Sequence, residues 1–176
     1  MKENLSLWQF GGFALTSLGG TLLHFLYDWT NESLLTAPFS GVNESTWEHM
    51  KLLFFPLFLF ALVQSLFFKE YKNFWCIKLK GTVAGLLTIP VLFYTYNGVF
   101  GKSPDWINIT IFFIAAAVTF ILETQSFNRN RTRCRRPKVA LFALMFIGLL
   151  FVVFTFLTPE IPLFQDPLTG LYGLNK

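Results

Sequence analysis

Charged residues are scarce in this chain of 176 residues. Only 14% of the chain is Asp, Glu, Lys or Arg, whereas an average soluble domain has about 25%. Hydrophobic residues make up 53%, and Phe alone occurs 23 times. This composition excludes a soluble globular domain, a disordered chain and, despite the net charge of +4, a nucleic-acid-binding protein. The composition indicates a membrane protein.

Long polar segments are also lacking. Five mainly apolar stretches, at about 7–27, 49–68, 79–96, 107–122 and 139–157, occupy most of the chain. A helix needs about 20 such residues to cross a hydrocarbon core of about 30 Å. We therefore predict an all-α integral membrane bundle of five transmembrane helices that forms one domain over residues 1–176. The expected partner is the lipid bilayer, with no nucleic acid.

Positive charge is scarce in one set of connecting segments, where Lys102 is balanced by Asp105, and is concentrated in the other set. The segment 28–48 has no Lys or Arg. The segments 69–80 and 123–138 contain Lys69, Lys72, Lys78, Lys80, Arg129, Arg131, Arg133, Arg135, Arg136 and Lys138. Lys and Arg accumulate in the cytoplasmic loops of membrane proteins. This distribution predicts a cytoplasmic N-terminus and an extracytoplasmic C-terminus.

Cysteine is nearly absent. Cys76 and Cys134 both lie near the predicted cytoplasmic face, where reducing conditions keep thiols free. Neither belongs to a C-x-x-C pair or lies near a histidine in the sequence, so we expect no metal or redox role for them. We also expect no disulfide.

The polar residues that are present gather at the extracytoplasmic ends of the predicted spans. The two histidines, His24 and His49, lie near the outer ends of adjacent spans. Ionisable groups at membrane depth are costly to bury and usually serve function. We predict a polar pocket here, with His24, His49, Asp28 and Glu44 as metal ligands and Glu48 and Asp166 as catalytic carboxyl groups.

Each of these residues also has a structural interpretation, and these alternatives stay open. Ser45 followed by Glu48 matches a capping box at the start of a helix. Asp28 at a helix end is typical of a membrane-interface anchor, and Asp166 before a proline is typical of a turn. His49 has no capping role, but one hydrogen bond to a neighbouring helix would satisfy it.

The tail from residue 159 combines prolines and glycines with regularly placed apolar residues, which favours turns lying on a surface. We expect this tail and the segment 28–48 to form a lid over the outer pocket. Consecutive spans usually pack as neighbours. Since His24 and His49 lie at matching depth, we expect them to approach each other.

Three segments carry a resemblance to a known family. They read H-F-L-Y-D-W at 24–29, V-N-E-S-T-W-E-H-M-K at 42–51 and P-L-F-Q-D-P-L-T-G-L-Y-G at 162–173. Over nearly its whole length the chain resembles an uncharacterised family of small bacterial polytopic membrane proteins with a V-N-E-S-x-W-E-H-x-K motif. The resemblance implies a multi-pass protein of the bacterial cytoplasmic (inner) membrane. It implies no activity, ligand or catalytic residue.

Several functions are compatible with the pocket. Three nitrogen or oxygen ligands and a water molecule suit a catalytic zinc ion, which favours a divalent-metal-dependent hydrolase acting on a lipid-like substrate at the interface. The chain has no H-E-x-x-H signature. The alternatives are a haem binder with two axial histidines, a small-solute transporter, and a non-enzymatic structural or accessory subunit. A transporter built from inverted halves is less favoured, because no internal repeat is visible.

Overall fold

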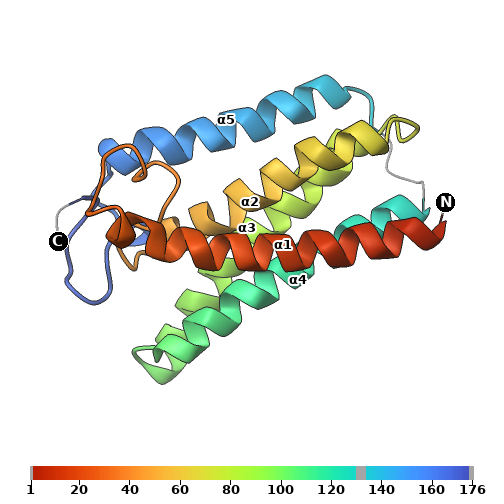
Figure 1. Cartoon of the computed structure of the whole chain (residues 1–176). Helices are drawn as coiled ribbons and strands as arrows, with labels where there is room; N and C mark the ends of the chain where they lie inside the picture. Colours follow the sequence, from red (N-terminus) through yellow and green to blue (C-terminus); the bar gives the residue numbers. More distant parts are fainter. Residues whose placement is uncertain (1, 130–133, 175–176) are drawn as a thin grey trace.

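The computed structural model describes residues 2–129 and 134–174, so Arg131 and Arg133 of the basic segment lie outside the described residues. In the described part, the helices are α1 (Lys2–Trp29), α2 (Thr46–Phe67), α3 (Phe74–Phe100), α4 (Asp105–Arg129), α5 (Pro137–Phe156) and the short 3-10 helix η1 (Pro162–Phe164). The predicted all-α fold with five long helices is confirmed. The helices run side by side, and the N-terminus and C-terminus lie at opposite ends of the bundle (Figure 1).

Four helices of the described chain, α2, α3, α4 and α5, are long and apolar enough to cross a membrane. The protein is therefore a multi-pass membrane protein by length and composition. Helix α1 is not among these four, and it carries more polar side chains, including Gln9, Thr16 and Ser17.

Helix α1 nevertheless lies antiparallel along α2. Near the N-terminus of α1, the ring centroid of Trp8 lies 5.8 Å from that of Phe68, which follows the last residue of α2. Near the other end, a Cβ added to Gly20 would lie only 3.0 Å from the carbonyl oxygen of Leu52. Such close approach of backbones is what small residues permit between membrane helices. The two helices therefore share the same depth over most of their length.

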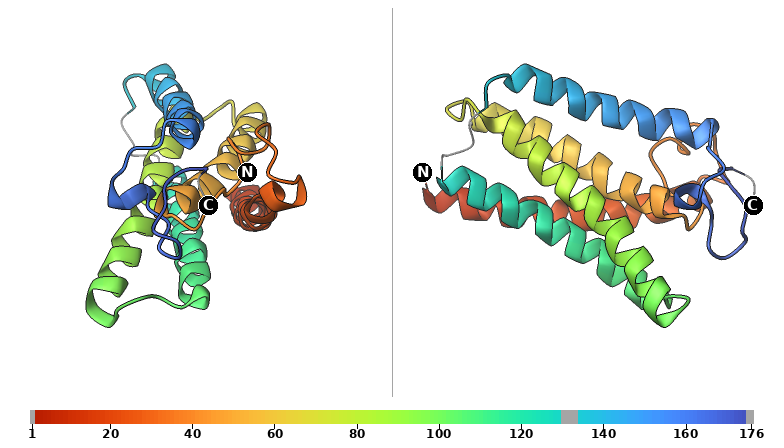
Figure 2. Two further views of the ribbon diagram at one scale, coloured as in Figure 1. Left: turned by 90° about the vertical axis from the view of Figure 1, so that its left-hand side faces the viewer. Right: turned by 180° about the vertical axis from the view of Figure 1, so that it is seen from behind.

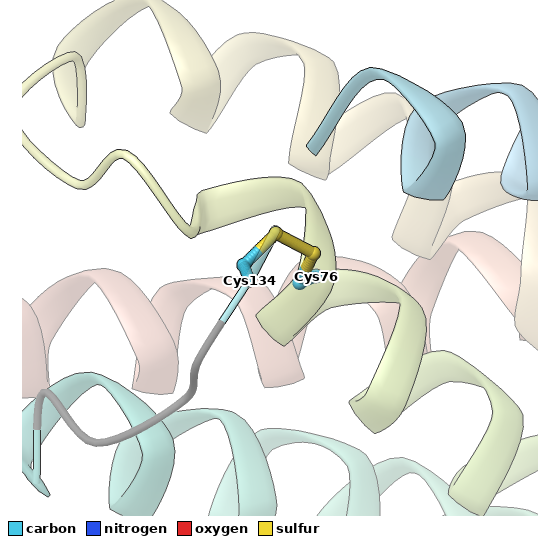
Figure 3. The surroundings of a disulfide bond; sticks show 2 residues. All are labelled: Cys76 and Cys134. Carbon is cyan, nitrogen blue, oxygen red and sulfur yellow. A yellow bond between two sulfur atoms is a disulfide. The ribbon is translucent and has the colours of Figure 1, made fainter. Parts of the chain in front are cut away.

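The expectation of two free thiols is wrong, because Cys76 and Cys134 form a disulfide (Figure 3). Cys76 lies in the first turn of α3, and Cys134 lies shortly before α5. Their Cα atoms are 6.0 Å apart, within the range that a disulfide bridges. The prediction failed because it used only the expected compartment and not the distance between the two segments.

The segment between α1 and α2 and the tail after α5 lie at the same end of the bundle (Figures 1 and 2). The side-chain amide of Asn43 donates a hydrogen bond to the carbonyl oxygen of Gly173 at 2.8 Å. Phe164 in η1 is buried, and its ring centroid lies 4.6 Å from that of Trp47 at the start of α2. The tail is thus packed onto the start of α2 and onto the segment that precedes it.

Candidate functional site

The two histidines meet at this end of the bundle, as predicted. The ring centroids of His24 in α1 and His49 in α2 are 5.9 Å apart. The carboxylate of Glu44 lies against both rings, with Oε1 3.5 Å from Nε2 of His24 and Oε2 3.6 Å from Nε2 of His49. Among the described residues, these three offer ligand atoms that all lie within 4.8 Å of one another.

The start of α2 orients the ring of His49. Its Nδ1 lies 3.0 Å from the carbonyl oxygen of Ser45, the N-cap residue of α2. Because a carbonyl oxygen can only accept, Nδ1 carries the proton in this hydrogen bond when the ring is neutral. The unprotonated Nε2 then faces Glu44. Metal-binding histidines typically use their second nitrogen in this way.

The polypeptide before Glu44 is fixed to the end of α1. The Ser40 hydroxyl donates to the carbonyl oxygen of Leu23 at 2.5 Å and accepts from the backbone N–H of Tyr27 at 2.8 Å. The side-chain oxygen of Asn43 accepts from the backbone N–H of Ser45 at 2.9 Å. Glu44 is therefore held from both sides, by α1 and by the start of α2.

Glu48 lies outside the group of three ligand residues. Its carboxylate pairs with Lys51 and accepts from the backbone N–H of Val42 at 3.1 Å. The Lys51 ammonium also donates to the carbonyl oxygen of Ala37 at 2.8 Å and to the Thr155 hydroxyl at 3.0 Å. Both charged side chains are buried. This pair clamps the segment before α2 against α2 and α5.

The capping box predicted for Ser45 and Glu48 is only half formed. The Ser45 hydroxyl accepts from the backbone N–H of Glu48 at 3.3 Å. The Glu48 carboxylate does not return the bond to the Ser45 N–H, because it is engaged by Lys51 and Val42.

The other two predicted acids also lie outside the group. Asp28 is exposed near the end of α1. Asp166 accepts from the backbone N–H of Leu168 at 2.7 Å, and its carbonyl oxygen accepts from the N–H of Gly170 at 2.8 Å. These are the bonds of a turn, which agrees with the structural interpretation of Asp166.

A cavity of about 280 Å³ adjoins the two histidines. Its lining comes from α1, α2 and α4 and consists of Gly20, Thr21, His24, Phe25, His49, Leu52, Ile109, Phe112 and Phe113. A second cavity of about 10 Å³ touches Glu44, His49 and Asn108. That space suits about one water molecule.

The sequence did not reveal a buried ion pair in the other half of the bundle. The charge pattern places Lys78 and Glu123 in connecting segments, but they lie in α3 and α4. Their side chains are 0% exposed, with Nζ 2.6 Å from Oε2. The Lys78 ammonium also lies over three aromatic rings, 5.4 Å from the nearest centroid. Phe127, the aromatic residue that follows Glu123 in α4, was the available signal in the sequence.

Comparisons with curated proteins and with solved structures give no match. A match to a protein family covers residues 1–174. The family is described as a family of unknown function, which agrees with the resemblance noted from the sequence. The bacterial origin and the V-N-E-S-x-W-E-H-x-K motif stay predictions. The chain therefore belongs to the family of unknown function DUF6512.

Proposed function

We propose that His24, Glu44 and His49 bind a divalent metal ion such as zinc, and that the protein is a metal-dependent hydrolase of a lipid-like substrate. The observation that carries this proposal is the convergence of three ligand side chains within 4.8 Å. They come from α1, from the segment before α2 and from α2 itself. The bond between His49 and Ser45 supports the proposal, because it leaves Nε2 of His49 available as a ligand.

A tetrahedral zinc ion would draw these three side chains closer together. Zinc bonds of about 2.0–2.1 Å to nitrogen and oxygen place neighbouring ligand atoms about 3.3 Å apart. Oε1 of Glu44 lies 3.5 Å from Nε2 of His24, Oε2 lies 3.6 Å from Nε2 of His49, and the three ligand atoms lie within 4.8 Å of one another. Binding through a single carboxylate oxygen would therefore require rotation of the Glu44 carboxylate and movement of the imidazoles towards it. Three protein ligands leave the fourth position to water, as catalytic zinc sites require.

A bound divalent ion would supply hydroxide near neutral pH and polarise a carbonyl group. The three side chains would hold the ion, and Ser45 would keep His49 in the binding tautomer. The small cavity beside Glu44 and Asn108 has room for the water. Catalytic roles for Glu48 and Asp166, and a ligand role for Asp28, stay predictions. The first two would require release from Lys51 and from the turn at Leu168.

The geometry favours the alternatives less. A haem would need a flat slot between two axial imidazoles, but the Glu44 carboxylate lies against Nε2 of both His24 and His49. Neither transport of a small solute nor an accessory role requires three metal-ligand side chains to lie close together, as His24, Glu44 and His49 do.

For the topology we propose five membrane spans with the basic face in the cytoplasm. The antiparallel packing of α1 along α2 supports α1 as the fifth span, and the excess of Lys and Arg supports the orientation. The disulfide between Cys76 and Cys134 opposes this orientation, because disulfides are rare in reducing compartments. Reporter fusions at the two ends of the chain distinguish the orientations. The bacterial cytoplasmic membrane remains the location that the resemblance implies.

The metal content of the protein purified in lipid nanodiscs tests the proposed function. After dialysis against zinc, we expect about one zinc ion per chain in the wild type and a large loss in the His24→Ala/His49→Ala double variant. Glu44→Gln should weaken binding at least about tenfold, whereas Glu160→Gln, an exposed acid at the same end of the bundle, should have no effect. Equal zinc in the wild type and the double variant would refute the site.

Once zinc binding is established, catalysis can be tested with vesicles of an ester phospholipid. We expect release of fatty acid that depends on zinc and is lost in Glu44→Gln. If the protein binds zinc but releases no fatty acid in a zinc-dependent reaction, it is a metal-binding protein, and the proposed hydrolase activity is wrong.

A further inference from the structure

The cavity of about 280 Å³ beside the histidines is lined by polar groups at only a few positions. Apart from the two imidazoles and Thr21, its lining is apolar. Three of its lining side chains, Phe25, Ile109 and Phe113, are 45%, 57% and 39% exposed. They belong to α1 and α4, and in a bilayer such exposed apolar side chains face lipid. The cavity therefore opens between α1 and α4 towards the hydrocarbon.

The cavity is closed where α1 and α4 touch. A Cβ added to Gly20 would lie 2.4 Å from Cζ of Phe112, so the Phe112 ring reaches the backbone of α1. The contact between Phe112 and Gly20 closes the cavity there, and the two imidazoles are the ionisable groups in its lining. A molecule in the cavity would therefore have its polar part at the histidines and would leave sideways into the bilayer.

We propose that this cavity, the α1–α4 slot, holds the acyl chain of a lipid taken directly from the bilayer, with the ester or amide group of that lipid at His24, Glu44 and His49. This inference rests on the proposed function and names its substrate class as an acyl lipid. It also identifies Thr21 as a residue that determines specificity.

The chemistry of the slot supports an acyl chain over a polar molecule. The Thr21 hydroxyl already donates to the carbonyl oxygen of Ser17 at 2.9 Å, as is common for hydroxyl side chains in helices. The polar groups left for a ligand are then the two imidazoles. A hydrocarbon chain gains little by moving from lipid into an apolar slot, since both are equally apolar. Selection in the slot therefore depends on shape, and filling it should exclude the chain.

Thr21 is suited to such a test, because it is exposed and lies one turn from His24 on the slot wall. Thr21→Phe would fill the slot from the lipid side without burying a new group in the core. Thr110→Phe is the matched control. Thr110 is also exposed, its hydroxyl also bonds to its own helix, and it does not line the slot.

The experiment uses cobalt-loaded protein in nanodiscs, because Co²⁺ binds similar nitrogen and oxygen sites and its visible spectrum reports its ligands. The probes are acetohydroxamate, which has a chelating head with one methyl group, and octanohydroxamate, which has the same head on an alkyl chain. Comparing variants with the same probe cancels the partitioning of that probe into the membrane.

We expect octanohydroxamate to bind the Thr21→Phe variant about tenfold more weakly than wild type. The added ring occupies the slot, so the alkyl chain of the probe would have to be forced into a space that is already packed. Acetohydroxamate should bind both proteins equally, and Thr110→Phe should match wild type with both probes. Equal octanohydroxamate affinity in Thr21→Phe and wild type would overturn the slot, as would equal weakening of both probes. A protein that binds no cobalt would instead refute the proposed metal site.

Discussion

Removing one partner of the buried pair between Lys78 and Glu123 should destabilise the protein strongly. Both side chains are 0% exposed, and their charged atoms are 2.6 Å apart. Either single change, Lys78→Met or Glu123→Gln, leaves a buried group without its partner. Breaking such a pair costs about 3–5 kcal/mol. For a chain of this length, that corresponds to a fall in the melting temperature of about 6–20 °C.

The double variant Lys78→Met/Glu123→Gln separates the pair interaction from loss of packing. With both charges removed, no isolated charge is left in the low-dielectric interior, and a buried pair contributes little beyond an apolar replacement. We therefore expect the double variant to be more stable than either single variant. Melting followed by tryptophan fluorescence in nanodiscs measures all three, with Lys80→Met as the control because Lys80 is exposed on the same helix.

Two results would refute this reasoning. Single variants that melt within about 2 °C of wild type would show that the pair contributes nothing to stability. Destabilisations that simply add in the double variant would show that Lys78 and Glu123 do not interact.

Three further predictions concern the tail, the cysteines and the helix cap. Phe164→Ala removes the buried ring that anchors the tail, so protease should cleave the tail much faster than in wild type; unchanged cleavage would mean that other contacts hold it. Under denaturing conditions, a maleimide should label neither Cys76 nor Cys134 until a reductant is added, and labelling beforehand would contradict the disulfide. Ser45→Ala removes a capping hydroxyl but keeps the backbone carbonyl that orients His49, so stability should fall by about 1 kcal/mol while zinc content stays the same. Lost zinc binding in a folded Ser45→Ala variant would contradict that separation of roles.

The five helices were predictable because apolar runs long enough to cross a membrane leave few alternatives. The boundaries near Lys78 and Glu123 were not. The sequence pattern assigns Lys78 and Glu123 to the connecting segments next to the spans. The helices continue past both residues because each charge is neutralised by a partner on the adjacent helix. Pairing of this kind depends on helix packing and leaves no local pattern in the sequence.

The approach of the two histidines was predictable from their equal depth on consecutive helices. The sequence did not predict which of the nearby acidic residues lies against the two imidazoles. Asp28 lies one helical turn from His24 in the sequence, yet Glu44 is the acid that reaches both rings. Its position depends on the bonds of Ser40 to α1 and on the Lys51 clamp. These contacts join segments that sequence periodicity does not relate.

X-ray absorption spectroscopy at the zinc edge of the zinc-loaded protein identifies the atoms that bind the metal ion. We expect nitrogen and oxygen atoms at about 2.0–2.1 Å from the zinc ion, with the scattering pattern of two imidazole rings from His24 and His49. Glu44→Gln should change this shell. Sulfur at about 2.3 Å, or a shell without imidazole, would contradict the site formed by His24, Glu44 and His49.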